Sequence, residues 1–139
     1  MPVFRLGPGQ EAEILAAPEL FDTSIHREAV RAYLADERNV FLLASEESKP
    51  VGFLRGTALG QLKSARRQMF LYEIGVVREF RRRGIAAELI RWLLRYCRSR
   101  GFQEVFVMTD PSNEAAVRLF RSTGGVTETS ADRMFVFRL

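Results

Sequence analysis

Cysteine and histidine are almost absent from the chain. Its 139 residues include one cysteine, Cys97, and one histidine, His26. A single cysteine excludes an internal disulfide and a metal site built from several cysteines, and we expect no metal cofactor. Cys97 falls on the apolar side of a predicted helix, so we interpret it as buried filling and not as a catalytic thiol. His26 precedes the apolar strands, and we expect it at the surface or in a substrate loop and not as a general base.

Long apolar runs are also missing. No uninterrupted run approaches the ~20 residues that a membrane helix needs. The N-terminal segment MPVFRLGPGQEAEIL lacks the charged stretch, apolar stretch and cleavage site of a secretory signal. We therefore expect a cytoplasmic protein with no membrane partner. The hydrophobic fraction of 47% and charged fraction of 27% are typical of a globular protein, and the length predicts one domain over residues 1–139.

Acidic residues are fewer than basic ones, 17 against 21, which gives a net charge of +4. A basic protein can bind nucleic acid. However, six of the arginines gather in and just after one short loop, where an anionic cofactor would account for them. Lys63, Arg66 and Arg67 form a second cluster without interleaved aromatics, which favours a solvated connection between strands. We expect no nucleic-acid partner.

The spacing of apolar residues predicts an α/β fold. Strands are expected at Val3–Leu6, Val40–Ser45, Val51–Ala58, Gln68–Val77, Glu104–Thr109 and Met134–Arg138, and helices at Gln10–Ala17, His26–Ala35, Ile85–Arg100 and Asn113–Thr123. The segment Glu46–Pro50 reads as the connection of a hairpin. Because the Ile85–Arg100 helix links two strands, these two should run parallel within a mixed sheet flanked by helices.

One turn has the composition of a phosphate cradle. The residues Arg81-Arg82-Arg83-Gly84-Ile85-Ala86 connect an apolar strand to an amphipathic helix whose polar face is Glu88, Arg91, Arg95 and Arg98. The unpaired N–H groups at a helix N-terminus attract anions, and small residues let the backbone approach a ligand. The turn therefore predicts a site for a phosphate-bearing cofactor.

The spacing Arg81-x-x-Gly84-x-Ala86 resembles the acyl-coenzyme A loop of the GNAT superfamily of N-acetyltransferases. A second stretch, residues 112–125, resembles the other signature of that superfamily: Asn113 begins a helix, Phe120 follows an inward Leu119, and glycines close the helix. Because two motifs occur in the right order and separation, the chain is identified as a member of the superfamily and expected to be an acyltransferase.

The resemblance implies how acetyl-coenzyme A would bind. In the superfamily the two parallel central strands splay apart and the cofactor enters the gap. The backbone of Ile74, Gly75, Val76 and Val77 would then contact the pantetheine arm, and one N–H would stabilise the oxyanion of a tetrahedral intermediate. The same resemblance assigns cofactor contacts to the loop and to the helix of the second signature, at Arg81, Arg82, Arg83, Gly84, Ile85, Ala86, Asn113 and Phe120.

Transfer of an acetyl group to an ammonium needs a base. Glu73 is the first candidate, because a carboxylate inside an apolar strand is costly unless it faces a cleft. The alternative is that Glu73 lies on the solvent face or pairs with an arginine. Asp110 is the second candidate, at the carboxyl end of a strand, where α/β folds place ligand groups. Its alternative is a helix cap before Pro111.

A closer resemblance, over nearly the whole chain, is to the small aminoglycoside 3-N-acetyltransferases. It rests on Arg5–Pro8, Tyr72-Glu73, Arg81–Ala86, Asp110 and Glu114–Val117. It implies that Glu73, Asp110 and Glu114 shape a pocket for a polycationic drug, and with it a role in antibiotic resistance. One position departs from the superfamily: Phe120 stands where a tyrosine often protonates the leaving thiolate. Either a thiolate of pKa near ~8.5 leaves unassisted, or water or the hydroxyl of Tyr72 substitutes.

Three hypotheses follow from different classes. The first is acetyl-coenzyme A-dependent acetylation of a small cationic amine, with an aminoglycoside at its 3-N position as the leading substrate. The second is a protein or peptide N-acetyltransferase of the same fold, and the third is a degenerate, non-catalytic coenzyme A binder, for which Phe120 is the best argument. The sequence leaves open the acceptor, the regiochemistry and whether the protein forms a homodimer.

Overall fold

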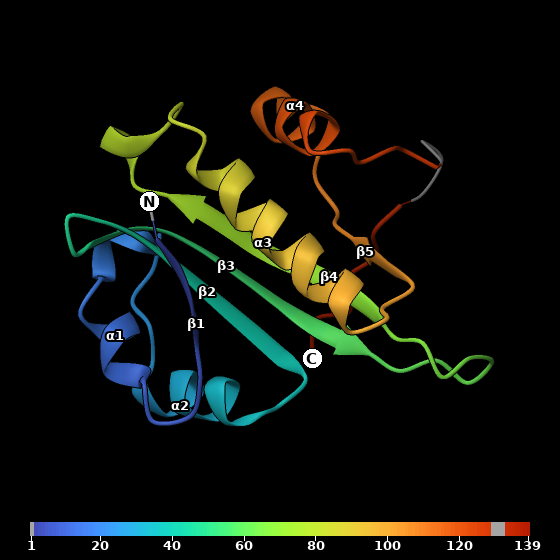
Figure 1. Ribbon diagram of the computed structural model, residues 1–139, viewed down its shortest axis with the longest axis horizontal. Helices are drawn as coiled ribbons and strands as arrows, with labels where there is room; N and C mark the ends of the chain where they lie inside the picture. The colour runs from blue at the N-terminus through green and yellow to red at the C-terminus, as the bar shows by residue number, and fades with distance from the viewer. Residues whose placement is uncertain (1, 129–132) are drawn as a thin grey trace. The chain divides into compact units, whose positions relative to one another are not determined.

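The computed structural model describes residues 2–128 and 133–139. Within it the chain forms two compact units, residues 1–108 and residues 109–139. The first unit contains β1 (Val3–Leu6), α1 (Glu11–Leu15), the 3-10 helix η1 (Pro18–Leu20), α2 (Arg27–Ala35), β2 (Asn39–Glu46), β3 (Lys49–Leu59), β4 (Gln68–Val76), the 3-10 helix η2 (Arg78–Phe80), α3 (Ile85–Ser99) and β5 (Glu104–Phe106) (Figure 1). The second unit contains α4 (Glu114–Ser122).

The five strands form one sheet in the order β1-β2-β3-β4-β5. The first four pair antiparallel, and β4 and β5 pair parallel. The predicted α/β class with a mixed sheet is therefore confirmed. The parallel pair follows from α3, which returns the chain to the end of the sheet at which β4 began (Figure 1).

The β2–β3 hairpin turns more tightly than the sequence predicts. Glu46 pairs with Lys49, so only Glu47 and Ser48 form the turn, with φ values of 49° and 64°. Two consecutive positive φ angles match the twist of a two-residue hairpin. Pro50 lies inside β3, outside the stretch Gly52–Leu59 that pairs with β4. A proline without a second strand neighbour removes no hydrogen bond from the sheet.

The two faces of the sheet pack against different helices. A Cβ added to Gly52 would lie 3.0 Å from Ile85 Cγ2 of α3. Its neighbour Phe53 instead packs in the core cluster of the other face, with Ile14 of α1, Leu20 of η1 and Leu34 of α2. Neighbouring side chains in a strand point to opposite faces. The sheet therefore lies between α3 on one face and α1, η1 and α2 on the other.

Helix α3 has the amphipathic character that the sequence predicts. Ile85, Leu89, Ile90, Leu93 and Cys97 are buried, and the predicted polar face is exposed. Burial raises the pKa of Cys97 to about 11, so its thiol stays protonated at neutral pH. The interpretation of Cys97 as buried filling is confirmed.

The loop between β3 and β4 is the solvated connection that its charge predicts, with Lys63, Arg66 and Arg67 exposed, and two of these residues also contact the segment that leads into β5. Arg66 Nε donates to the Gly101 carbonyl at 3.2 Å, and Arg66 Nη2 donates to the Phe102 carbonyl at 3.0 Å. The Arg67 guanidinium lies 4.7 Å from the centre of the Phe102 ring. These arginines hold the loop against the segment that leads into β5, because carbonyls left over after a helix need donors.

Two further expectations differ from the structure. The helix predicted over Gln10–Ala17 is confined to Glu11–Leu15, and Pro18 starts the separate helix η1, since a residue before proline avoids the helical region. The final strand predicted over Met134–Arg138 is wrong: these described residues pair with no strand. An alternating pattern suits a strand, but a strand forms only where another strand offers its backbone. None of the helices in the described part of the chain has the length and apolarity that crossing a bilayer requires.

Candidate active site

Strand β4 has an open edge over its second half. Strand β5 pairs only with Gln68–Phe70, whereas β4 continues to Val76. From Leu71 onward β4 pairs with β3 on one side and with no described strand on the other. The two parallel strands therefore separate after three residue pairs, as the resemblance to the superfamily implies.

The open edge exposes alternate backbone groups. Val77 N–H donates to the Val51 carbonyl at 2.9 Å, so Val77 faces β3. Because backbone groups alternate along an antiparallel strand, Gly75 also faces β3, and Ile74 and Val76 face the open edge. The Val76 carbonyl accepts from Arg81 Nε at 3.1 Å. Of the predicted segment Ile74–Val77, the N–H groups of Ile74 and Val76 are those in a position to meet a ligand.

Gly75 has a packing role. A Cβ at this residue would lie 2.8 Å from Phe53 Cε1, closer than real Cβ contacts. The Phe53 ring lies over the glycine in the core cluster of the α1–α2 face. Glycine therefore lets an aromatic ring lie flat against the strand at this point.

A β-bulge lies at the start of the open half. Arg55 pairs with Glu73 and Gly56 pairs with Leu71, so Tyr72 is the extra residue. A bulge of this kind breaks the usual alternation of side chains. The Arg55 side chain contacts both neighbours: its Nε lies 2.6 Å from Glu73 Oε1, and its guanidinium carbon lies 4.3 Å from the centre of the Tyr72 ring. Tyr72 and Glu73 are thus on the same face of the sheet.

Glu73 has an arginine partner, which is the alternative that the sequence left open. Its side chain is 47% exposed and that of Arg55 is 31% exposed, so the carboxylate is accessible although it is paired. Both side chains lie on the face of Phe53, the α1–α2 face. Arg55 was missed by the sequence reasoning. The available signal was an arginine inside the apolar strand Lys49–Leu59, opposite an acidic residue in the neighbouring strand.

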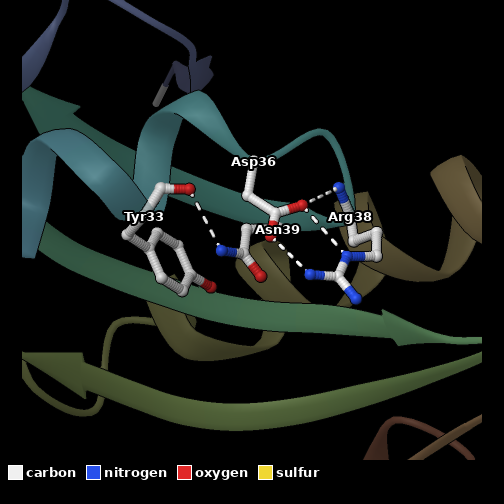
Figure 2. Close-up of polar contacts among 4 residues, drawn as sticks. All are labelled: Tyr33, Asp36, Arg38 and Asn39. Atoms are coloured by element: carbon white, nitrogen blue, oxygen red, sulfur yellow. Dashed lines mark hydrogen bonds and ion pairs between the residues drawn. The ribbon is translucent and has the colours of Figure 1, made fainter.

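Tyr33 of α2 lies beside this pair. The centre of its ring lies 5.4 Å from the Arg55 guanidinium carbon, and its hydroxyl lies within hydrogen-bond distance of the carbonyls of Gly56 (2.8 Å) and Val40 (3.0 Å). Burial raises the pKa of Tyr33 to about 12, so the phenol remains a donor. Asn39 Nδ2 donates to the Tyr33 carbonyl at 3.1 Å, and an Asp36–Arg38 ion pair closes the same turn (Figure 2).

The turn between β4 and α3 forms an open cradle. Arg82 has φ 64° and Gly84 has φ 79°, and a Cβ on Gly84 would meet nothing within 4 Å. The N–H groups of residues 82–87 donate to no acceptor among the described residues. A row of such donors at a helix N-terminus fits a phosphate group. The residues of the cradle therefore fit the diphosphate of acetyl-coenzyme A.

The arginines of the turn differ in their partners. Arg81 bonds the Val76 carbonyl, as described above. Arg83 Nη1 lies 3.6 Å from Glu46 Oε2, and its guanidinium stacks 4.8 Å from the centre of the Phe80 ring. A cavity of about 500 Å³ lies at this point, lined by Glu46, Glu47, Lys49, Phe80 and Arg83. The side chains of Arg81 and Arg83 therefore fix the turn, Arg81 against the end of β4 and Arg83 against the end of β2.

In the second unit, Asp110 closes a local turn. Its Oδ1 accepts from Ser112 N–H at 2.8 Å and from Ser112 Oγ at 2.7 Å. These hydrogen bonds lower the pKa of Asp110. A carboxylate stabilised in this way is a weak base. Asp110 therefore closes the turn that precedes α4, whereas the cap of that helix is Asn113.

The other predicted residues of this unit lie on α4. Asn113 caps the helix, with its Oδ1 accepting from Ala116 N–H at 3.1 Å. Glu114 Oε2 lies 3.9 Å from Arg118 Nη1. The Phe120 carbonyl accepts from Gly125 N–H at 2.8 Å and closes the helix. His26 has a comparable capping role on α2, where its Nδ1 accepts from Ala29 N–H.

Comparison with known proteins supports one family. Residues 10–124 match the model of the acetyltransferase (GNAT) family. Human N-acetyltransferase 8 is 30% identical over 94 residues, which are 68% of this chain and 41% of that protein. The chain therefore matches about two-fifths of the length of that relative.

Solved structures agree with this result. An aminoglycoside acetyltransferase from an uncultured soil metagenomic sample, in complex with sisomicin, has a TM-score of 0.88 and 25% identity, covering 99% of this chain and 96% of that one. A second aminoglycoside acetyltransferase from such a sample has a TM-score of 0.81 and 28% identity, covering 98% of both chains. The chain thus belongs to the GNAT acetyltransferase family, whose members use acetyl-coenzyme A.

Proposed function

We propose that the protein transfers an acetyl group from acetyl-coenzyme A directly to a primary amine of a small cationic molecule, with an aminoglycoside as the leading acceptor. The observation that carries the proposal is the open edge of β4. There an accessible carboxylate, Glu73, lies one residue from a backbone N–H that faces the gap, that of Ile74. A base and an oxyanion donor side by side are the two groups that amide formation requires.

Each part of the site has a proposed task. The N–H groups of residues 82–87 bind the diphosphate, and the N–H groups of Ile74 and Val76 contact the pantetheine arm and the thioester carbonyl. When bound, acetyl-coenzyme A supplies the activated acetyl group. Glu73 takes a proton from the acceptor ammonium, so that the nitrogen lone pair can attack the carbonyl carbon. The carbon–nitrogen bond forms and the carbon–sulfur bond then breaks, while the nitrogen gives up its second proton and the departing sulfur takes one up, so that the products are a neutral amide and a thiol.

The leaving thiolate needs no tyrosine at position 120. Its ordinary pKa of ~8.5 makes it a competent leaving group. Tyr72, which is 57% exposed and neighbours the base, carries a hydroxyl that can return a proton to the sulfur. Phe120 therefore does not oblige the protein to be a degenerate binder.

The acceptor is proposed from charge. By the family resemblance, the carboxylate of Glu73, and separately those of Asp110 and Glu114 in the second unit, would each attract ammonium groups of the drug, and the 3-N position is the proposed site of transfer. Support comes from the two aminoglycoside acetyltransferases of similar structure, one of them in complex with sisomicin. The name of the relative N-acetyltransferase 8 states no acceptor, so a different amine, such as that of a peptide, is the second candidate.

A thiol-release assay tests the proposal. Purified protein is mixed with acetyl-coenzyme A and with amines of three classes: aminoglycosides, polyamines and peptides. We expect thiol release with an aminoglycoside, and acetylation at the 3-amino group by mass spectrometry and NMR. Turnover with peptides alone would favour the second candidate. Tight acetyl-coenzyme A binding without turnover of any amine would indicate a non-catalytic binder.

A double variant tests the carboxylates of the second unit. Asp110→Asn combined with Glu114→Gln should raise KM for the drug, because two charges that attract ammonium groups are lost. KM for acetyl-coenzyme A should not change. Added salt should weaken drug binding more in the wild type than in the double variant. A wild-type KM for the drug in the double variant would contradict this pocket.

A further inference from the structure

We propose that Arg55 is a positioning residue for Glu73, holding one carboxylate oxygen so that the other is presented at the open edge of β4. The inference rests on the proposed function, because it concerns the same carboxylate. It adds a residue that neither the sequence motifs nor the family comparison assigns. The juxtaposition that carries it is an arginine of β3, a carboxylate of β4 and two tyrosine rings.

The pair is built into the sheet. Arg55 and Glu73 are direct partners across β3 and β4, and Arg55 Nε lies 2.6 Å from Glu73 Oε1. Directly opposed residues bring their side chains together without a long reach. The contact is a single charge-assisted hydrogen bond to one oxygen. Glu73 Oε2 accepts no hydrogen bond from the described residues, so it is the oxygen in a position to receive a proton.

The Arg55 guanidinium is also restricted by two aromatic rings. Its central carbon lies 4.3 Å from the centre of the Tyr72 ring and 5.4 Å from that of Tyr33. Arginine stacks well on aromatic faces. Tyr33 is itself fixed, because its hydroxyl is bonded to the sheet and its carbonyl accepts from Asn39 (Figure 2). The ring of Tyr33 and the ring of Tyr72 at the bulge therefore restrict the Arg55 side chain, and Arg55 in turn restricts Glu73.

Without Arg55, Glu73 would lose its one fixed partner. A half-exposed glutamate samples several staggered rotamers, and only some of them would direct an oxygen toward the acceptor nitrogen. A reacting group that is misplaced in this way can lower the rate by up to about 10²-fold. The guanidinium also has an opposite effect, since its positive charge repels an ammonium group. Removal of Arg55 should therefore lower kcat and, at the same time, leave KM for a cationic acceptor unchanged or lower it.

Five variants, counting Glu73→Gln alone as the reference for the double variant, separate positioning from other roles. Arg55→Gln removes the charge and the Nε donor, whereas Arg55→Lys keeps the charge and removes only the guanidinium donor. Arg55→Gln is also made in a Glu73→Gln background. The matched control is Arg38→Gln, which breaks an arginine–carboxylate pair of 2.8 Å at the turn after α2, away from Glu73. Each is measured for kcat and for KM of the acceptor and of acetyl-coenzyme A.

We expect Arg55→Gln to lower kcat about 10- to 100-fold and Arg55→Lys to recover part of it. In the Glu73→Gln background the same substitution should change kcat by less than about twofold, since residues that act through one another are not additive. Arg38→Gln should keep wild-type kinetics. An equal loss of kcat in both backgrounds would overturn the proposal, as it would mean that Arg55 acts independently of Glu73.

A crystal structure of the Arg55→Gln protein gives a readout that needs no acceptor. We expect the Glu73 side chain to occupy more than one rotamer there, and to keep a single rotamer in Arg38→Gln. A single unchanged rotamer in Arg55→Gln would overturn the positioning role even if no acceptor is known. Full kcat in Glu73→Gln alone would contradict the base assignment of the proposed function, while the rotamer result would still decide the structural claim.

Discussion

Gln68–Phe70, at the start of β4, lie between β3 and β5, whereas Glu73–Val76, at its end, pair with β3 alone. In the first half, Met69 is 0% exposed and packs in the interior. In the second half, Glu73 is 47% exposed and alternate backbone groups face a gap. One strand therefore divides two tasks: the half with two partners holds the sheet together, and the half with one partner is accessible for chemistry. Substitutions in the two halves should affect different measurements.

The largest expected effect concerns the accessible half. Glu73→Gln should lower kcat by ~10²–10⁴-fold, the usual contribution of a general base. Activity should recover partly at high pH, where the amine loses its proton without help. The free energy of unfolding should change by less than about 1 kcal/mol, because the pair with Arg55 is partly exposed and solvent screens it. Steady-state kinetics across pH test the loss of kcat, and urea denaturation tests the free energy of unfolding. Full kcat in Glu73→Gln, with loss of kcat in Asp110→Asn, would reverse the two roles.

The second prediction concerns the half of β4 that pairs with both β3 and β5. Met69→Ala removes a fully buried side chain and should lower the free energy of unfolding by about 2–5 kcal/mol. The folded fraction should keep kcat near that of the wild type, because Met69 points into the core. Urea denaturation gives the stability, and kinetics at low temperature give the activity per folded molecule. A stable Met69→Ala protein that has lost kcat would break the division between the halves.

The third prediction concerns the cradle that follows the accessible half. Gly84→Val places a β-branched residue at φ 79°, a strain of about 1–3 kcal/mol. If the loop relieves the strain by moving, the affinity for acetyl-coenzyme A should fall roughly 5- to 150-fold. Asn tolerates positive φ, so Gly84→Asn is the matched control and should bind more tightly than Gly84→Val. Calorimetry measures both. Unchanged affinity in a folded Gly84→Val protein would remove the cradle from the cofactor site.

The smallest expected effect concerns the support under the accessible half. The pKa of Tyr33 is about 12 in the folded protein and 10.0 in an ordinary phenol. Between these values the unfolded chain loses the proton while the folded protein keeps it, so the stability contributed by this phenol is complete below pH 10 and is lost as the pH rises toward 12. Urea denaturation on either side of pH 10 should show a steeper loss in the wild type than in Tyr33→Phe. Equal slopes would mean that the phenol ionises in the folded state as it does in water.

Most of the fold could be predicted from the sequence because its elements are strongly patterned. Helix α3 repeats its buried residues at helical spacing, and β4 is an apolar run, so both were located within one residue at each end. The hairpin turn was placed too widely, since glutamate and serine at positive φ are rare and give no signal. The strand expected at Met134–Arg138 was wrong because pattern alone cannot show whether a partner strand is available.

The candidate site could be predicted in its motifs but not in its contacts. The cradle follows from Arg81–Ala86, because glycine and small residues before a helix are visible in a sequence. The Arg55–Glu73 pair is not visible in this way, since it depends on the register of two strands and on a bulge. Tyr33 is still further from prediction, as it reaches the pair from a helix about twenty residues upstream.

The bulge at Tyr72 also bears on how such a site can change by mutation. Leu71 and Ile74 keep the same face of β4 on either side of the extra residue, so the interior of the protein is not re-sorted by its presence. One inserted codon can thereby add a side chain next to the Glu73 carboxylate without demanding compensating substitutions in the core. Deletion of Tyr72 should likewise leave the protein able to fold. Changes at this single position could therefore alter the acceptor preference among related proteins without a loss of stability.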